Sequence, residues 1–253
     1  MPGTSAGSYA HILGLPAVLR TFAFTLLGRL TYGVLPLALL FTIQEATGSF
    51  AIAASAMGLN GLASLSMPIK SRAIDRYGQR FVLPVISLSL SVALAGAALL
   101  ASSGLQHSGV WLATALLIGL ASPPLGPSMR AQWRLLVPRE QLTAAYSLDA
   151  VAEESLYLIG PVIAAGLLAV APPYAGLLVC AGLVVFGGLG LATSPVADRR
   201  PDATKPRVGL GPLRHAHFLA LLAVMAVVGL ISATVFTATA ARALAAGQPS
   251  LAG

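Results

Sequence analysis

The chain has 253 residues, of which 57% are hydrophobic and only 9% are charged. A soluble globular domain carries about 25% charged residues, so this composition excludes a water-soluble fold and indicates that lipid covers most of the surface. The net charge is +7, but the basic residues stand in short runs between long apolar stretches and form no continuous basic face. We therefore expect membrane lipids, and no nucleic acid, among the partners of the chain.

Seven apolar stretches are long enough to cross the hydrocarbon core of a bilayer, which takes about 20 residues in a helix. They are Ala17–Ile43, Phe50–Pro68, Phe81–Ala101, Val110–Met129, Leu142–Val170, Tyr174–Thr193 and Phe218–Ala241. Only helices and closed barrels satisfy every backbone polar group in lipid. The fold class predicted is therefore an all-α membrane protein.

The basic residues occupy alternate connections between these spans. The second-to-third, fourth-to-fifth and sixth-to-seventh connections hold Lys70, Arg72, Arg76, Arg80, Arg130, Arg134, Arg139, Arg199, Arg200, Lys205, Arg207 and Arg214. The connections on the opposite side hold no Lys or Arg. The positive-inside rule then predicts a multi-pass protein of the cell inner (plasma) membrane with its amino terminus in the cytoplasm.

A basic segment rich in proline separates six spans from the seventh. This pattern predicts a six-span amino-terminal bundle (residues 1–194), a basic cytoplasmic linker (195–216), and a seventh span with the truncated start of a second bundle (217–253). Six spans, a linker and a further span are the layout of a transporter built from two halves.

The connection between spans two and three contains a short charged motif within residues 71–80. Asp75, Arg76, Gly78 and Arg80 match the signature of the major facilitator superfamily at the same place, although its leading glycine and one of its basic residues are missing. The chain thus resembles the amino-terminal half of a twelve-span member of this superfamily, together with the seventh span. The resemblance implies a secondary transporter in which this loop acts as a cytoplasmic gate; the alternative is an ordinary positively charged loop.

Span five carries a polar stripe on an otherwise apolar helix. At 100° per residue, the members of this stripe fall within one sector about 80° wide. They are Tyr146, Asp149, Glu153, Tyr157, Gly160 and Ala164. Carboxylates within a membrane usually face the bundle interior, so the stripe should point inward, whereas Glu154 points about 80° away. The alternative is that Asp149 pairs with Arg130 or Arg134 and only fixes the end of the helix.

Span one supplies a cation at nearly the depth of Glu153. Arg29 lies about twelve residues inside this span, and an unpaired buried arginine would be prohibitive, so we expect an Arg29–Glu153 ion pair. The resemblance also implies that span one lines the central cavity. The candidate cavity and proton-coupling residues are then Arg29, Glu153, Asp149, Glu154, Tyr32 and Tyr157. A fixed structural ion pair is the alternative.

Gly160 and Pro161 stand where actinobacterial-type drug/proton antiporters of this superfamily carry a Gly-Pro motif. The resemblance is partial, because Leu156, Ala164 and Ala165 occupy positions where that motif has glycine. Small residues here allow a close helix approach, and Pro161 allows a kink. The prolines of span four likewise indicate either a broken helix that lines a cavity or tolerated kinks.

The function predicted is secondary active transport of small molecules, in the form of proton-coupled efflux by alternating access, with a small-molecule substrate and the proton as partners. The alternative is a truncated half-transporter that is inactive without a second half or self-association. A membrane-embedded enzyme is disfavoured, because no nucleophile stands with a base at membrane depth. The single cysteine, Cys180, and four scattered histidines predict no metal site, and no cofactor is expected.

Overall fold

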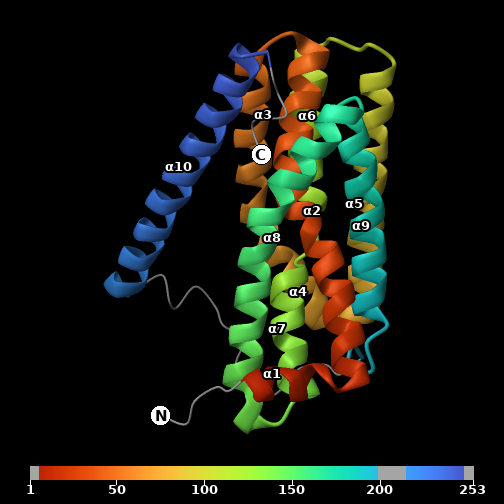
Figure 1. The fold of residues 1–253 in the computed structure, drawn as a ribbon, viewed down its shortest axis with the longest axis vertical. Coiled ribbons are helices and arrows are strands. Elements are labelled where there is room, and N and C mark those ends of the chain that lie inside the picture. The colour runs from red at the N-terminus through yellow and green to blue at the C-terminus, as the bar shows by residue number, and fades with distance from the viewer. Residues whose placement is uncertain (1–5, 199–214, 248–253) are drawn as a thin grey trace.

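The computed structural model describes residues 6–198 and 215–247, and within them every regular element is a helix. The helices form an upright bundle with a tenth α-helix at its side (Figure 1). In chain order they are α1 (Ala6–Leu13), α2 (Pro16–Thr47), α3 (Phe50–Leu62), α4 (Met67–Tyr77), α5 (Gln79–Ser102), α6 (Ser108–Ala121), α7 (Leu125–Leu136), α8 (Leu142–Val170), α9 (Tyr174–Ala192) and α10 (Ala216–Ala245). Short 3-10 turns, Ala63–Ser66 and Arg139–Gln141, precede α4 and α8.

Seven of the described helical segments are long and apolar enough to cross a membrane. They are α2, α3 with α4, α5, α6 with α7, α8 with its preceding turn, α9, and the Val227–Ala245 part of α10. The predicted all-α membrane fold is thus confirmed. Two spans are longer than expected, because span two continues to Tyr77 instead of ending at Pro68, and span four continues to Leu136 instead of ending at Met129. Span four is interrupted at residues 122–124, which agrees with the broken helix that its prolines indicated.

The first span, α2, forms the centre of the bundle and runs along its whole length (Figure 1). Most of α2 is buried by the surrounding helices, and it packs mainly against α9, α8 and α3. One half of the core surrounds Phe41, Trp111 and Cys180. The other surrounds Phe22 and Trp133, whose ring centroids lie 5.2 Å apart.

Glycines allow α2 to approach two of its neighbours at backbone contact. A Cβ on Gly28 would lie 3.1 Å from the Cα of Gly187 on α9. A Cβ on Gly33 would lie 2.6 Å from the carbonyl oxygen of Leu156 and 2.9 Å from the Cα of Gly160, both on α8. Helix association in lipid depends on such close packing of small residues, since lipid tails are as apolar as the side chains.

A single residue, Gly78, links α4 to α5. Its φ of 87° and ψ of 153° lie in a region of backbone conformation that is essentially restricted to glycine. The motif residues Asp75 and Arg76 therefore belong to the last turn of α4, and Arg80 to the first turn of α5. The segment predicted to be a loop is a tight reversal between two helices.

The last described helix, α10, lies obliquely beside the bundle and is nearest to it at its carboxyl end (Figure 1). There Ala240 and Ala243 are buried and join the core that contains Phe41. The predicted linker, residues 195–216, falls for the most part outside the described residues, as does the end of the predicted third segment.

Candidate transport site in the bundle

The centre of the candidate site is an ion pair between Arg29 of α2 and Asp149 of α8. Nη1 of Arg29 lies 2.9 Å from Oδ1 of Asp149, and Nη2 lies 3.4 Å from Oδ2, so the guanidinium faces both carboxylate oxygens. Each side chain is only 1% exposed. Nη2 also donates to the carbonyl oxygen of Gly126 on α7, at 3.2 Å. Charge-assisted bonds in this paired geometry are the strongest that a buried arginine can make.

The close contact of α2 with α8 brings these two side chains together. Gly33 follows Arg29 by one turn on α2, and its backbone touches that of Gly160 on α8. Because residues one turn apart share a helix face, the glycine contact holds the Arg29 face of α2 against α8. The predicted role of Gly160 in close helix approach therefore corresponds to an observed contact with Gly33.

A second arginine extends the pair into a network of four charged residues. Arg130 of α7 donates through Nη2 to Oε2 of Glu153, at 2.7 Å, and its Nε lies 3.5 Å from Oδ2 of Asp149. Arg29, Asp149, Arg130 and Glu153 thus alternate in charge and sum to zero. The two pairs differ in exposure. The side chains of Arg130 and Glu153 are 54% and 21% exposed, whereas those of Arg29 and Asp149 are 1% exposed. We refer to these residues as the charge network.

The expected Arg29–Glu153 pair is wrong, because Asp149 is the partner of Arg29 and Arg130 is the partner of Glu153. The apolar stretch of span four ends at Met129, so Arg130 was assigned to a cytoplasmic connection. In the structure α7 continues to Leu136 and keeps Arg130 beside α8. The alternative pairing of Asp149 with Arg130 is present as the longer contact of 3.5 Å.

The remaining candidate residues lie around this network to different extents. The hydroxyl of Tyr32 donates to the carbonyl oxygen of Pro123, in the interruption of span four. Tyr157 is 49% exposed and lies within electrostatic reach of Glu153 and Glu154. Glu154 itself is exposed and makes no ion pair with any described residue. It stands next to the network without being part of it.

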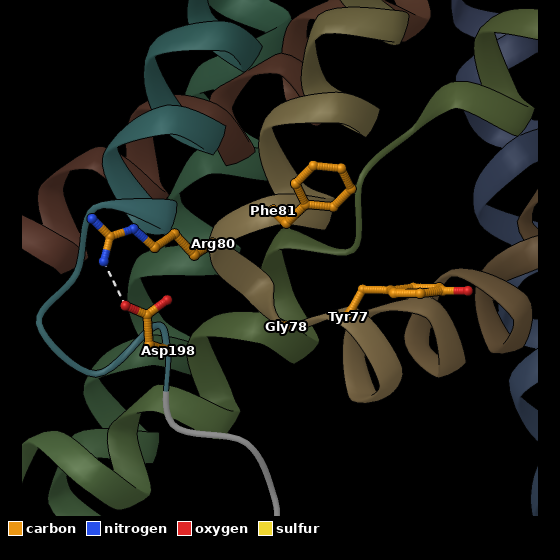
Figure 2. A pocket seen from close by; sticks show the side chains of 5 residues that line it. All are labelled: Tyr77, Gly78, Arg80, Phe81 and Asp198. Carbon is orange, nitrogen blue, oxygen red and sulfur yellow. Dashed lines mark hydrogen bonds and ion pairs between the residues drawn. The ribbon is translucent and has the colours of Figure 1, made fainter.

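The motif residues form a separate surface site at the reversal between α4 and α5. Arg80 pairs with Asp198, which follows α9, at 2.5 Å, and these two residues line a shallow pocket with Tyr77, Gly78 and Phe81 (Figure 2). The guanidinium of Arg76 lies 5.2 Å from the ring centroid of Tyr77. Asp75 is exposed and makes no ion pair within the described part of the chain.

Sequence reasoning missed Asp198 as the partner of Arg80 and the carbonyl of Gly126 as an acceptor for Arg29. Asp198 offered a weak signal, since it is an acidic residue among basic ones, whereas a backbone carbonyl leaves no trace in the sequence. Within the searched part of the chain, no group of three or more His, Cys, Asp or Glu side chains is placed to hold a metal ion.

Comparison with known proteins adds the family. A sequence model described as the Major Facilitator Superfamily matches residues 19–250, which include six of the seven spans completely and the first from its fourth residue onward. No curated protein and no solved structure matches the chain. The match extends over most of the chain and agrees with the seven-span helical structure. The chain therefore belongs to the Major Facilitator Superfamily of membrane transporters.

Proposed function

We propose that this chain takes part in proton-coupled efflux of small molecules by alternating access, and that the charge network is its proton-coupling site. The family supports membrane transport of small molecules in general. The observation that favours proton coupling is the shared carboxylate of Asp149, which contacts Arg29 and Arg130 at once. Efflux is supported by Gly160 and Pro161, because drug/proton antiporters of the superfamily carry a similar pair. A membrane-embedded enzyme receives no support from the site.

The network offers a route for a proton to change the ion pairs. Glu153 is its more exposed carboxylate, and on this ground it is the proposed proton acceptor. A proton on Glu153 removes the charge that holds Arg130, and Arg130 then competes with Arg29 for Asp149. Such an exchange of partners inside a low-dielectric bundle alters which helices are held together, and this is how a proton can bias two conformations of a transporter.

Neutralising Glu153 is expected to uncouple transport from the proton gradient. In everted vesicles, uphill movement of a cationic dye such as ethidium should fall by about tenfold or more in Glu153→Gln. The glutamine side chain cannot gain or lose a proton, so position 153 stays neutral throughout the transport cycle. Energy-independent exchange of the same dye should remain. Glu45→Gln, at the far end of α2, is the matched control. Uphill transport at the normal rate by Glu153→Gln would exclude this residue as the coupling carboxylate.

The proposed location is the plasma membrane, with the amino terminus in the cytoplasm. Support comes from the basic residues at one end of the bundle, around the α4–α5 reversal and the α7–α8 connection. With Cys180 replaced, Ser103→Cys is expected to react with an impermeant maleimide from outside the cell, and Glu140→Cys only after the membrane is opened. Both positions are exposed in the structure. The reverse labelling pattern would overturn the orientation.

We further propose that transport needs a second helix bundle beside this one. The exposed face of α8 carries Glu154 and Tyr157 in the middle of a membrane span, where a carboxylate facing lipid is costly. A second transporter half, or a second copy of the chain, would cover this face. Monomeric 253-residue protein in liposomes should then show no substrate-stimulated proton flux, and robust flux from a proven monomer would contradict the proposal.

A further inference from the structure

Span four is interrupted between α6 and α7, and the interruption exposes backbone carbonyl groups inside the bundle. Ser122 has an extended ψ of 121°, and Pro123 and Pro124 have no N–H to continue the helical hydrogen bonds. The last carbonyls of a helix need partners from elsewhere when they are buried. The structure provides these partners from side chains of spans one and two.

The donor from span two is Lys70, a residue of α4 that is only 8% exposed. Its Nζ lies 2.8 Å from the carbonyl oxygen of Ser122 and 3.3 Å from that of Gly119. No described carboxylate lies within ion-pair distance of Lys70. The sequence placed Lys70 among the basic residues of a cytoplasmic connection, whereas the structure shows a buried ammonium at the negative end of the α6 dipole.

The two halves of span four are attached to different neighbours. The upper half, α6, is joined to span two, because Asn60 donates to the carbonyl of Ala115 at 3.0 Å, and a Cβ on Gly119 would lie 2.5 Å from the carbonyl oxygen of Asn60. The lower half, α7, is joined to the charge network through Gly126 and Arg130. The interruption is therefore the boundary between two groups of packed helices.

We propose that Lys70 is a positioning residue that holds the interruption of span four, and through it sets the position of α7 against the charge network. The carbonyl of Ser122, which Lys70 holds, lies next to that of Pro123, which accepts from Tyr32. Three residues farther on, Gly126 accepts from Arg29. Loss of the ammonium frees this segment, so that Arg130 is no longer fixed beside Asp149 and Glu153. Lys70 is distinct from the superfamily motif and from the network itself.

Hydrogen exchange tests the first part of this inference on the full chain in detergent micelles. In Lys70→Met, the amides of the non-proline residues between 122 and 129 should exchange about tenfold faster, because local opening no longer breaks two hydrogen bonds. Amides of α9 serve as the internal reference for global stability. The matched control is Arg72→Met, which removes an exposed charge from the same helix. Unchanged exchange in Lys70→Met, or an equal rise in Arg72→Met, would overturn the inference.

The second readout is the energetic coupling between Lys70 and Glu153. This coupling should be absent if Lys70 stabilises only the segment around Ser122. In the background of Lys70→Met, the drop in melting temperature caused by Glu153→Gln should be about half of that in the unmodified chain, because Arg130 is already displaced from Glu153. Strictly additive effects would show that Lys70 does not position the network. If Lys70→Met fails to fold, Lys70→Gln takes its place, because it removes the ammonium charge and leaves only a shorter, neutral donor. A smaller rise in exchange of the same amides is then expected, and no rise would overturn the inference. Neither measurement requires transport, so this inference and the proposed proton coupling can fail separately.

Discussion

Replacing Asp149 by asparagine is expected to lower the free energy of unfolding by about 3–5 kcal/mol, the usual loss when one partner of a buried ion pair is removed. The change leaves the charge of Arg29 buried with neutral acceptors only, the carbonyl of Gly126 and the new side-chain amide oxygen at position 149. Arg29→Met should cost less, because Arg130 still lies 3.5 Å from Asp149 and compensates its charge. The double variant should be more stable than Asp149→Asn alone. Reversible unfolding in mixed micelles, with all four members of the cycle, measures these differences.

The exposed ion pair at the α4–α5 reversal is the control for this experiment. Arg80 and Asp198 are 69% and 62% exposed, and exposed pairs contribute at most about 1 kcal/mol. The cycle of Arg80→Met with Asp198→Asn should therefore show a coupling energy several times smaller than the Arg29–Asp149 cycle. Losses from Arg29→Met and Asp149→Asn that simply add would mean that the buried pair is not coupled at all.

Replacing Gly160 by valine is expected to be a strongly destabilising change on α8, comparable to the loss of Asp149. The new side chain would meet the backbone of Gly33, which cannot move aside as a flexible side chain can. Overpacking of this kind costs typically 1–3 kcal/mol, and we expect about 3 kcal/mol or more because the three nearest atoms all belong to the main chain of Gly33. Separation of α2 from α8 should also pull Arg29 away from Asp149, so the variant should lose proton-coupled transport.

Gly166, two turns farther along the same helix, is the matched control. No atom lies within 4 Å of a Cβ built at this position, so Gly166→Val should change the free energy of unfolding by about 0.5 kcal/mol or less, as at other surface positions. The same unfolding assay measures both variants. Equal stability of the two would show that the contact between Gly33 and Gly160 does not hold α2 against α8.

The fold could be predicted from the sequence because a membrane imposes a simple rule on it. Each crossing needs a long apolar helix, so the number and order of spans follow from hydropathy alone. Part of the stripe of span five was also predictable, since helical periodicity places Asp149 and Glu153 on one face, but Tyr157 of the same stripe is 49% exposed and does not point inward. Both carboxylates do belong to the charge network.

The pairing within the site could not be predicted in the same way. The depth of a residue in the membrane is counted from the end of its helix. Hydropathy ends spans two and four at Pro68 and Met129, several residues before the helices end at Tyr77 and Leu136. Charged residues in the final turns of a span, such as Lys70 and Arg130, have the same composition as loop residues. Their positions depend on how far the helix continues past its apolar part, and tertiary contacts decide this.

The reversal at Gly78 has a consequence for biosynthesis. With one residue between α4 and α5, the second and third spans form a helical hairpin, and we expect them to enter the bilayer together. The charges that orient this hairpin lie on its helical ends, at Arg72, Arg76 and Arg80, and not in a flexible loop. A residue inserted next to Gly78 would therefore rotate one helix of the hairpin about its axis by about 100°. The face of that helix that packs against other helices would then turn toward lipid.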